Sequence, residues 1–95
     1  MSAPPTVARR LTISGRVQGV GFRYALADEA RARKLSGWVR NRRDGTVEAV
    51  VAGPQPEVEA VIAWARRGPP AAHVAEVKVE PAGTEPSGFE IVSTL

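Results

Sequence analysis

The sequence contains no cysteine and a single histidine, His73. Without cysteine the chain forms no disulfide and has neither a thiolate metal site nor a cysteine nucleophile. One histidine also excludes any site that needs two imidazoles. A cysteine-free chain fits a reducing compartment. We assign His73 to an exposed loop and give it no functional role.

Long apolar runs are absent as well. No stretch approaches the roughly 20 apolar residues of a membrane-spanning helix, and the first residues lack the charged head and apolar stretch of a signal peptide. We therefore expect a cytoplasmic protein that has no membrane partner. Its 95 residues predict one domain, with residues 1–6 as a flexible N-terminal tail and residues 7–95 as the folded part.

The chain has little net charge: 13 Lys and Arg against 10 Asp and Glu give +3, and 11 of the 13 cations are arginine. This excess is too small to predict a nucleic-acid partner. Arginine is nevertheless the better cation for forked recognition of phosphate or carboxylate. Individual arginine positions are therefore of interest.

Apolar periodicity predicts two helices and five strands. A period of two indicates strands, and an i, i+3, i+4, i+7 spacing indicates helices. Asp44-Gly45 predicts a two-residue hairpin turn between the second and third strands. The predicted strands cover residues 7–14, 38–43, 46–52, 74–80 and 89–92, and the predicted helices cover residues 22–35 and the segment between residues 53 and 69.

This order, βαββαβ followed by a short strand, predicts an α+β ferredoxin-like sandwich. Its sheet is antiparallel, both helices cover one face, and the short extra strand is C-terminal. In this topology the first and second strands run parallel on either side of the third. The loop after the first strand and Asn41, near the end of the second, should therefore lie at the same edge. Alternation places Trp38 with Val51 on one face and Val39 with Asn41 on the other, and we assign Trp38 and Trp64 to packing.

A glycine-rich loop, Gly15-Arg-Val-Gln-Gly-Val-Gly21, runs into the first helix. Backbone N–H groups at a helix start lack partners and the helix dipole is positive there, while glycines let the main chain approach an anion closely. Arg23 falls in the first helical turn, where the dipole disfavours a cation unless an anion lies between them. The loop matches neither the Walker pattern nor the dinucleotide fingerprint, and a loop that merely turns tightly is the alternative.

Asn41 is an amide among strand residues, where asparagine is disfavoured. It either prepares the turn or offers an amide that orients a water molecule. The neighbouring Arg40, Arg42 and Arg43 are interpreted as solvated charges. Arg16 either assists the anion or faces water.

Residues 13–23 resemble the first acylphosphatase signature, and residues 37–47, running on to Gly53, resemble the second. The resemblance implies a ferredoxin-like enzyme that hydrolyses acyl phosphates to a carboxylate and inorganic phosphate, without metal, cofactor or covalent intermediate. It implies a small-molecule acyl phosphate as substrate and inorganic phosphate as product and competitive inhibitor. The implied catalytic residues are Arg23 and Asn41, with Asn41 orienting the water. The implied phosphate-binding groups are the backbone amides of Gln18, Gly19, Val20, Gly21 and Phe22 and the guanidinium of Arg23.

Two other functions stay open on the sequence. A phosphate- or ligand-sensing module without catalysis would use the same fold and loop. RNA binding is a further use of a βαββαβ sheet, but residues 46–52 contain no aromatic side chain on which a base stacks. We therefore predict no nucleic-acid partner.

Overall fold

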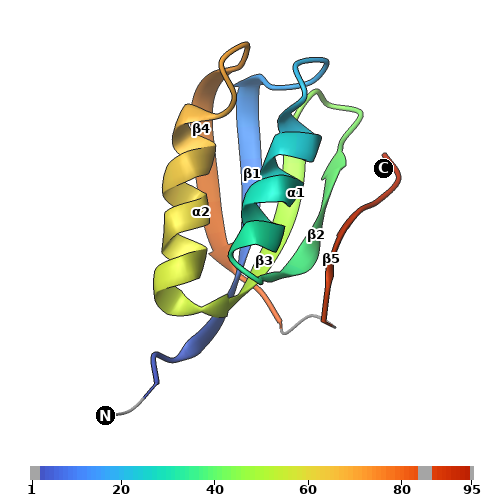
Figure 1. Ribbon diagram of the computed structural model, residues 1–95. Helices are drawn as coiled ribbons and strands as arrows, with labels where there is room; N and C mark the ends of the chain where they lie inside the picture. The colour runs from blue at the N-terminus through green and yellow to red at the C-terminus, as the bar shows by residue number, and fades with distance from the viewer. Residues whose placement is uncertain (1–2, 84–86, 95) are drawn as a thin grey trace.

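The computed structural model describes residues 3–83 and 87–94. The predicted order of elements is confirmed (Figure 1). No helix among the described residues is long and apolar enough to cross a membrane. The elements are β1 (Thr6–Arg16), α1 (Phe22–Ala32), β2 (Ser36–Asn41), β3 (Val47–Pro54), α2 (Gln55–Arg67), β4 (His73–Pro81) and β5 (Phe89–Ile91).

The strands form one five-stranded sheet in the order β4-β1-β3-β2-β5, and α1 and α2 lie side by side over one of its faces (Figure 1). The ferredoxin-like prediction is confirmed, including β3 between β1 and β2. The sheet is not wholly antiparallel, however, because β5 pairs parallel with β2. Alternation reveals which face a residue occupies but carries no information on strand direction.

The core lies between the sheet and the two helices. The register pairs Trp38 with Val50 and Val39 with Ala49, and direct cross-strand partners share a face. Val51 therefore lies on the core face with Val39, and the predicted pairing of Trp38 with Val51 is wrong. Fully buried core residues include Leu11, Ile13, Leu26, Ala27, Ala30, Val39, Val47, Ala49, Val51, Val58, Val61 and Ala65.

Helix α1 ends three residues before the predicted end at Leu35. Lys34 adopts a positive φ of 57°, and the Leu35 N–H donates back to the Ala30 carbonyl at 2.9 Å. This six-to-one bond is the Schellman ending of a helix. The bond returns the buried Leu35 side chain to the core. Leu35 therefore belongs to the cap that follows the helix and not to the helix itself.

The β2–β3 connection also differs from the prediction. Strand β2 ends at Asn41, and residues 42–46 lead to β3. The Arg42 N–H donates to the Thr46 carbonyl at 2.8 Å, and the Gly45 N–H donates to the Arg42 carbonyl at 3.1 Å. These bonds close a three-residue loop in which Gly45, with φ 94°, takes the left-handed position. The predicted two-residue Asp44-Gly45 turn is therefore wrong.

The β1–α1 loop and the β2–β3 hairpin lie at the same end of the molecule, as the topology predicts (Figure 1). Strand β1 begins at Thr6, whose Cα pairs with that of Pro54. His73 is exposed, as expected. It is, however, the first residue of the edge strand β4 and not part of a loop.

Candidate active site

The loop between β1 and α1 is held at both ends by buried apolar side chains. Val17 and Phe22 are each 1% exposed. The Phe22 ring packs against Trp64 of α2, with ring centroids 5.5 Å apart and the planes tilted by 60°. Because aromatic contacts of this kind add to area burial, the start of α1 is fixed to the second helix. The packing role predicted for Trp64 is confirmed.

Between these anchors the main chain curls outward. Gly19 has φ 74° and Gly21 has φ 78°, and Gly21 is the N-cap of α1. Left-handed backbone of this kind favours glycine. A Cβ atom built on Gly19 or Gly21 would meet no other atom within 4 Å. The loop therefore presents bare backbone to open space at the helix start.

The N–H groups of this loop find no acceptor in residues 3–83 and 87–94. Within the described part of the chain, none of the N–H groups of residues 18–22 donates a hydrogen bond of good geometry. The first N–H groups of a helix have no intrahelical acceptor, and the dipole places partial positive charge beside them. Such a group of donors binds anions.

Arg23 lies in the first turn of α1 and is partly buried. Its guanidinium carbon lies 5.7 Å from the ring centroid of Tyr24. Among the described residues no carboxylate lies within ion-pair distance of this guanidinium. An arginine at the positive end of the dipole, without a counterion, retains its full capacity for an anionic ligand.

Asn41 is the last residue of β2 and shares the core face with Val39, at the end of the sheet where α1 begins. Its Oδ1 atom is buried and accepts no hydrogen bond from the described residues. A buried carbonyl oxygen without a donor costs free energy. Orphaned atoms of this kind in a native fold call for an explanation, and a water or ligand that donates to Oδ1 supplies one.

The Gln18 side chain joins the loop to the hairpin. Its Nε2 atom donates to the Arg42 carbonyl at 2.7 Å and to the Thr46 carbonyl at 2.9 Å. The structure thus brings the predicted phosphate loop against the hairpin that follows Asn41. The family resemblance implies only a backbone role for Gln18. Both acceptors are main-chain atoms more than 20 residues away, so no side-chain pattern identifies this contact.

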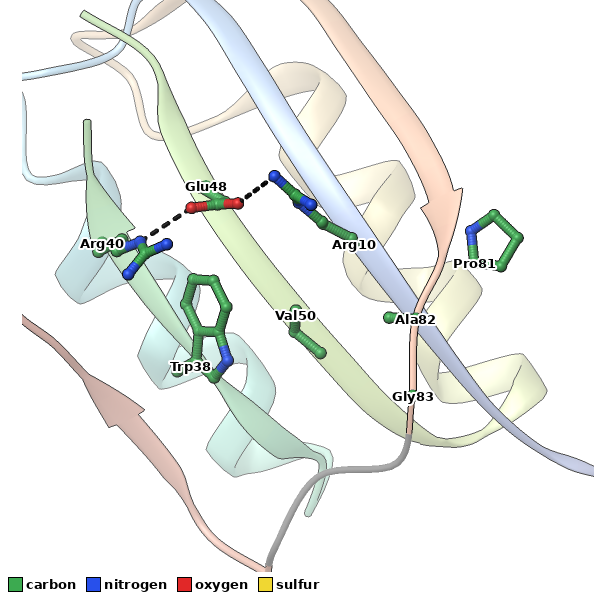
Figure 2. A pocket seen from close by; sticks show the side chains of 8 residues that line it. All are labelled: Arg10, Trp38, Arg40, Glu48, Val50, Pro81, Ala82 and Gly83. Atoms are coloured by element: carbon green, nitrogen blue, oxygen red, sulfur yellow. Dashed lines mark hydrogen bonds and ion pairs between the residues drawn. The ribbon is translucent and has the colours of Figure 1, made fainter. Parts of the chain in front are cut away.

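The opposite face of the sheet carries an ion-pair cluster, defined by Glu48 and the three arginines around it, Arg10, Arg40 and Arg42. Glu48 is 2% exposed and its carboxylate lies 2.7 Å from Arg10, 2.8 Å from Arg40 and 3.1 Å from Arg42. Figure 2 shows the first two of these contacts. The interpretation of Arg40 and Arg42 as solvated charges is therefore wrong, whereas Arg43 is exposed as expected.

Burial pushes the pKa of Glu48 upward, but the hydrogen bonds from Arg40 and Arg42 and the charges of Arg40 and Arg10 outweigh burial. The pKa of this carboxyl is consequently lowered, and Glu48 stays ionised at neutral pH. The cluster also holds the two residues that flank Asn41. Both flanking side chains point to the outer face, since neighbours in a strand alternate.

A pocket adjoins this cluster, lined by Arg10, Trp38, Arg40, Glu48, Val50, Pro81, Ala82 and Gly83 (Figure 2). Trp38 lies here, half-buried, with the Arg40 guanidinium 4.7 Å from its ring centroid. The core packing predicted for Trp38 is thus wrong. The pocket contains neither Arg23 nor Asn41 and lies on the other face from both. It is separate from the candidate site.

Comparison with known proteins gives the family. The model of the acylphosphatase family matches residues 9–91. The chain belongs to the acylphosphatase family. Acylphosphatase 2 of Ralstonia nicotianae is 53% identical over 87 residues, covering 90% of this chain and 92% of the relative. The acylphosphatase of Thermococcus kodakarensis is 54% identical over 89 residues, covering 90% and 96%.

An acylphosphatase from Coxiella burnetii has the same fold, with a TM-score of 0.87 and 35% sequence identity over 92% of this chain and 93% of that one. The chain is thus an acylphosphatase, an enzyme that hydrolyses acyl phosphates, and its substrate is a small-molecule acyl phosphate. The resemblance read from the two sequence segments is confirmed. The relatives do not favour the alternative of a non-catalytic sensing module.

Proposed function

We propose that the backbone amides of residues 18–22 and the Arg23 guanidinium hold the phosphate of the acyl phosphate, and that Asn41 orients the attacking water. The observation that carries this proposal is the contact between loop and hairpin. Gln18 brings the loop against the hairpin that follows Asn41. Among the described residues, the loop N–H groups have no acceptor and the buried Oδ1 of Asn41 has no donor. The N–H donors of the loop and the Asn41 acceptor therefore belong to the same site.

The phosphate is bound by donors alone. Its non-bridging oxygens accept from the loop N–H groups and from the fork of Arg23, and charge-assisted bonds of this kind are short and strong. In phosphoryl transfer, negative charge spreads over the equatorial oxygens of the transition state. Fixed donors aimed at those oxygens stabilise this charge without reorganisation.

The water is placed by Asn41. One water hydrogen is donated to Oδ1, so that an oxygen lone pair faces phosphorus on the side opposite the acyl oxygen. As the new P–O bond forms, the P–O bond to the acyl group breaks and its electron pair leaves with the carboxylate. The water proton passes to a phosphate oxygen of the substrate. Because a carboxylate is a good leaving group, positioning supplies most of the catalysis.

Inorganic phosphate, the product, presents the same oxygens to the same donors. We therefore propose that it is a competitive inhibitor. Its binding requires the loop and Arg23 but not the water position, so phosphate inhibition separates the two functions of the site.

The Asn41→Ala variant tests this division of roles. Hydrolysis of benzoyl phosphate, followed by ultraviolet absorbance in chelator, should show kcat reduced on the order of a hundredfold or more, since a positioning group is lost. The inhibition constant of inorganic phosphate should stay within about twofold of the original value. Arg43→Ala, which removes an exposed side chain two residues further on, is the matched control and should hydrolyse normally. If phosphate inhibition disappears together with turnover, Asn41 is a phosphate ligand or a structural residue.

A further inference from the structure

We propose that Gln18 is a positioning residue for this reaction, whose side-chain amide fixes the distance between the phosphate loop and Asn41. This inference rests on the proposed roles of the loop and of Asn41. It goes beyond them because it assigns a task to the Gln18 side chain, whereas those roles use only the Gln18 backbone N–H.

Both hydrogens of the Gln18 amide are used on the hairpin. They are donated to the carbonyls of Arg42 and Thr46, which are the same two carbonyls that accept the bonds closing the hairpin. Arg42 directly follows Asn41, and Thr46 directly precedes Val47, the register partner of Asn41. The Gln18 amide therefore binds both chains of the hairpin immediately beyond the Asn41–Val47 pair, on its turn side.

The Asn41 side chain is not held through its own oxygen, since Oδ1 accepts no bond from the described residues. Its place relative to the loop depends on where the end of β2 lies. The ion-pair cluster holds the side chains of Arg40 and Arg42 on the outer face. Among the described residues, no side chain of that cluster makes a hydrogen bond or an ion pair with the loop. Gln18 supplies the link on the catalytic face.

The chemical consequence follows from the geometry of in-line attack. Phosphorus is placed by the loop, and the water is placed by Asn41, so the distance between loop and hairpin is the distance between the reacting atoms. A misplacement of about 1 Å can cost on the order of a hundredfold in rate. Losing the Gln18 amide should therefore slow the chemical step more than it weakens phosphate binding.

Gln18→Met keeps the length of the side chain and removes both donors. We expect kcat for benzoyl phosphate to fall roughly ten- to a hundredfold, while the inhibition constant of inorganic phosphate changes less than about threefold. Urea unfolding of the same variant reports whether the fold is intact. Gln18→Leu, which removes the same two donors without adding a charge to the phosphate loop, provides a second variant and should show the same split.

A double-mutant cycle with Asn41→Ala gives the decisive measurement, because a residue that acts through Asn41 loses its effect once Asn41 is gone. In the Asn41→Ala background, Gln18→Met should change the residual kcat less than about twofold. Additive losses would overturn the inference, as would a loss confined to phosphate affinity. An Asn41→Ala variant that hydrolyses normally would instead overturn the proposed function, and this inference would fall with it.

Discussion

Two kinds of polar residue lie near the end of β2. Glu48 is buried and satisfied by three guanidiniums. By contrast, within the described part of the chain the buried Oδ1 atom of Asn41 has no hydrogen-bond donor and Arg23 has no counterion. An unpaired buried acceptor and an uncompensated cation both reduce stability in the absence of ligand. Their unmet bonding capacity is what a substrate can use.

Arg23→Ala should abolish most phosphate affinity and lower kcat/KM for benzoyl phosphate on the order of a hundredfold or more, because a fork of charge-assisted donors is lost. Arg23→Lys should recover only part of the loss, since an ammonium is a point charge without the fork. Lys78→Ala, which removes an exposed cation of β4, serves as the control.

Thermal unfolding gives an independent reading of the same variant. A ligand that binds only the folded state stabilises it by about 2.7 kcal/mol when present at a hundredfold excess over its dissociation constant. Phosphate should therefore raise the melting temperature of the original chain and leave that of Arg23→Ala unchanged. Near-normal turnover by Arg23→Ala would refute its role, whichever way the melting temperature moves.

Glycines near the end of β1 and in the loop that follows it serve two different purposes. Gly15, with φ 114°, follows the register shift between β1 and β4, and a Cβ there would lie 2.2 Å from the His73 carbonyl oxygen and 2.6 Å from the Ala75 nitrogen. Gly19, with φ 74°, would carry a Cβ into open space. The first glycine is needed for strand packing, and the second for curling the loop.

Gly15→Ala should therefore destabilise the fold severely, by about 3 kcal/mol or more, because two backbone atoms of β4 have to move. Gly19→Ala should cost only about 1–2 kcal/mol, the penalty for a left-handed alanine, but its methyl group should raise the inhibition constant of phosphate. Urea unfolding and phosphate inhibition of both variants test this contrast. Equal losses of stability would contradict the packing explanation for Gly15.

At the scale of the whole molecule, the ion-pair cluster joins three neighbouring strands. Arg10 is on β1, Arg40 is on β2 and Glu48 is on β3. The Glu48 carboxylate therefore links the three central strands of the sheet, on the face opposite α1 and α2. Acidification should affect this link, because the pKa of Glu48 is lowered in the folded chain against the effect of burial.

A carboxyl whose pKa is lower in the folded than in the unfolded state stabilises the fold above its unfolded pKa, and this contribution is lost as the pH falls through the folded pKa. Glu48→Gln should therefore lower the free energy of unfolding by about 1.5–3 kcal/mol near neutral pH, the range for hydrogen bonds to a charged group. This difference from the original chain should shrink below about pH 4. Glu76→Gln, an exposed carboxyl on β4, should show little difference at either pH. A constant deficit for Glu48→Gln would contradict the assignment.

Local patterns in the sequence were sufficient for the order of elements, for the glycine loop before α1 and for Arg23 in its first turn. Asn41 could be placed at the same edge from topology alone. The contacts of Gln18 could not be predicted, because its acceptors are main-chain carbonyls. Glu48 could not be recognised as buried, because an acid between Val47 and Ala49 has the pattern of a solvent-facing strand residue, and the arginines that surround it come from other strands or from beyond the turn.

Several expectations stay predictions: the cytoplasmic compartment, the flexibility of the tail assigned to residues 1–6, and the absence of nucleic-acid and membrane partners. Thr6, the last residue of that range, is the first residue of β1. The roles of Arg23, Asn41 and the loop amides stay proposals that the variants above test. The fold and the hydrolysis of acyl phosphates follow from the family.

The bonds from Gln18 end on main-chain oxygens, and this has a consequence for redesign. Any amino acid at positions 42 and 46 presents the same carbonyls, while the side chains of Arg43 and Asp44 are exposed. The link between loop and hairpin therefore depends on the backbone of the turn and not on its side chains. Arg43 can be exchanged without loss of either acceptor, whereas Asp44 also shapes the turn, because its carboxylate accepts from the N–H and the hydroxyl of Thr46 at 2.9 and 2.7 Å.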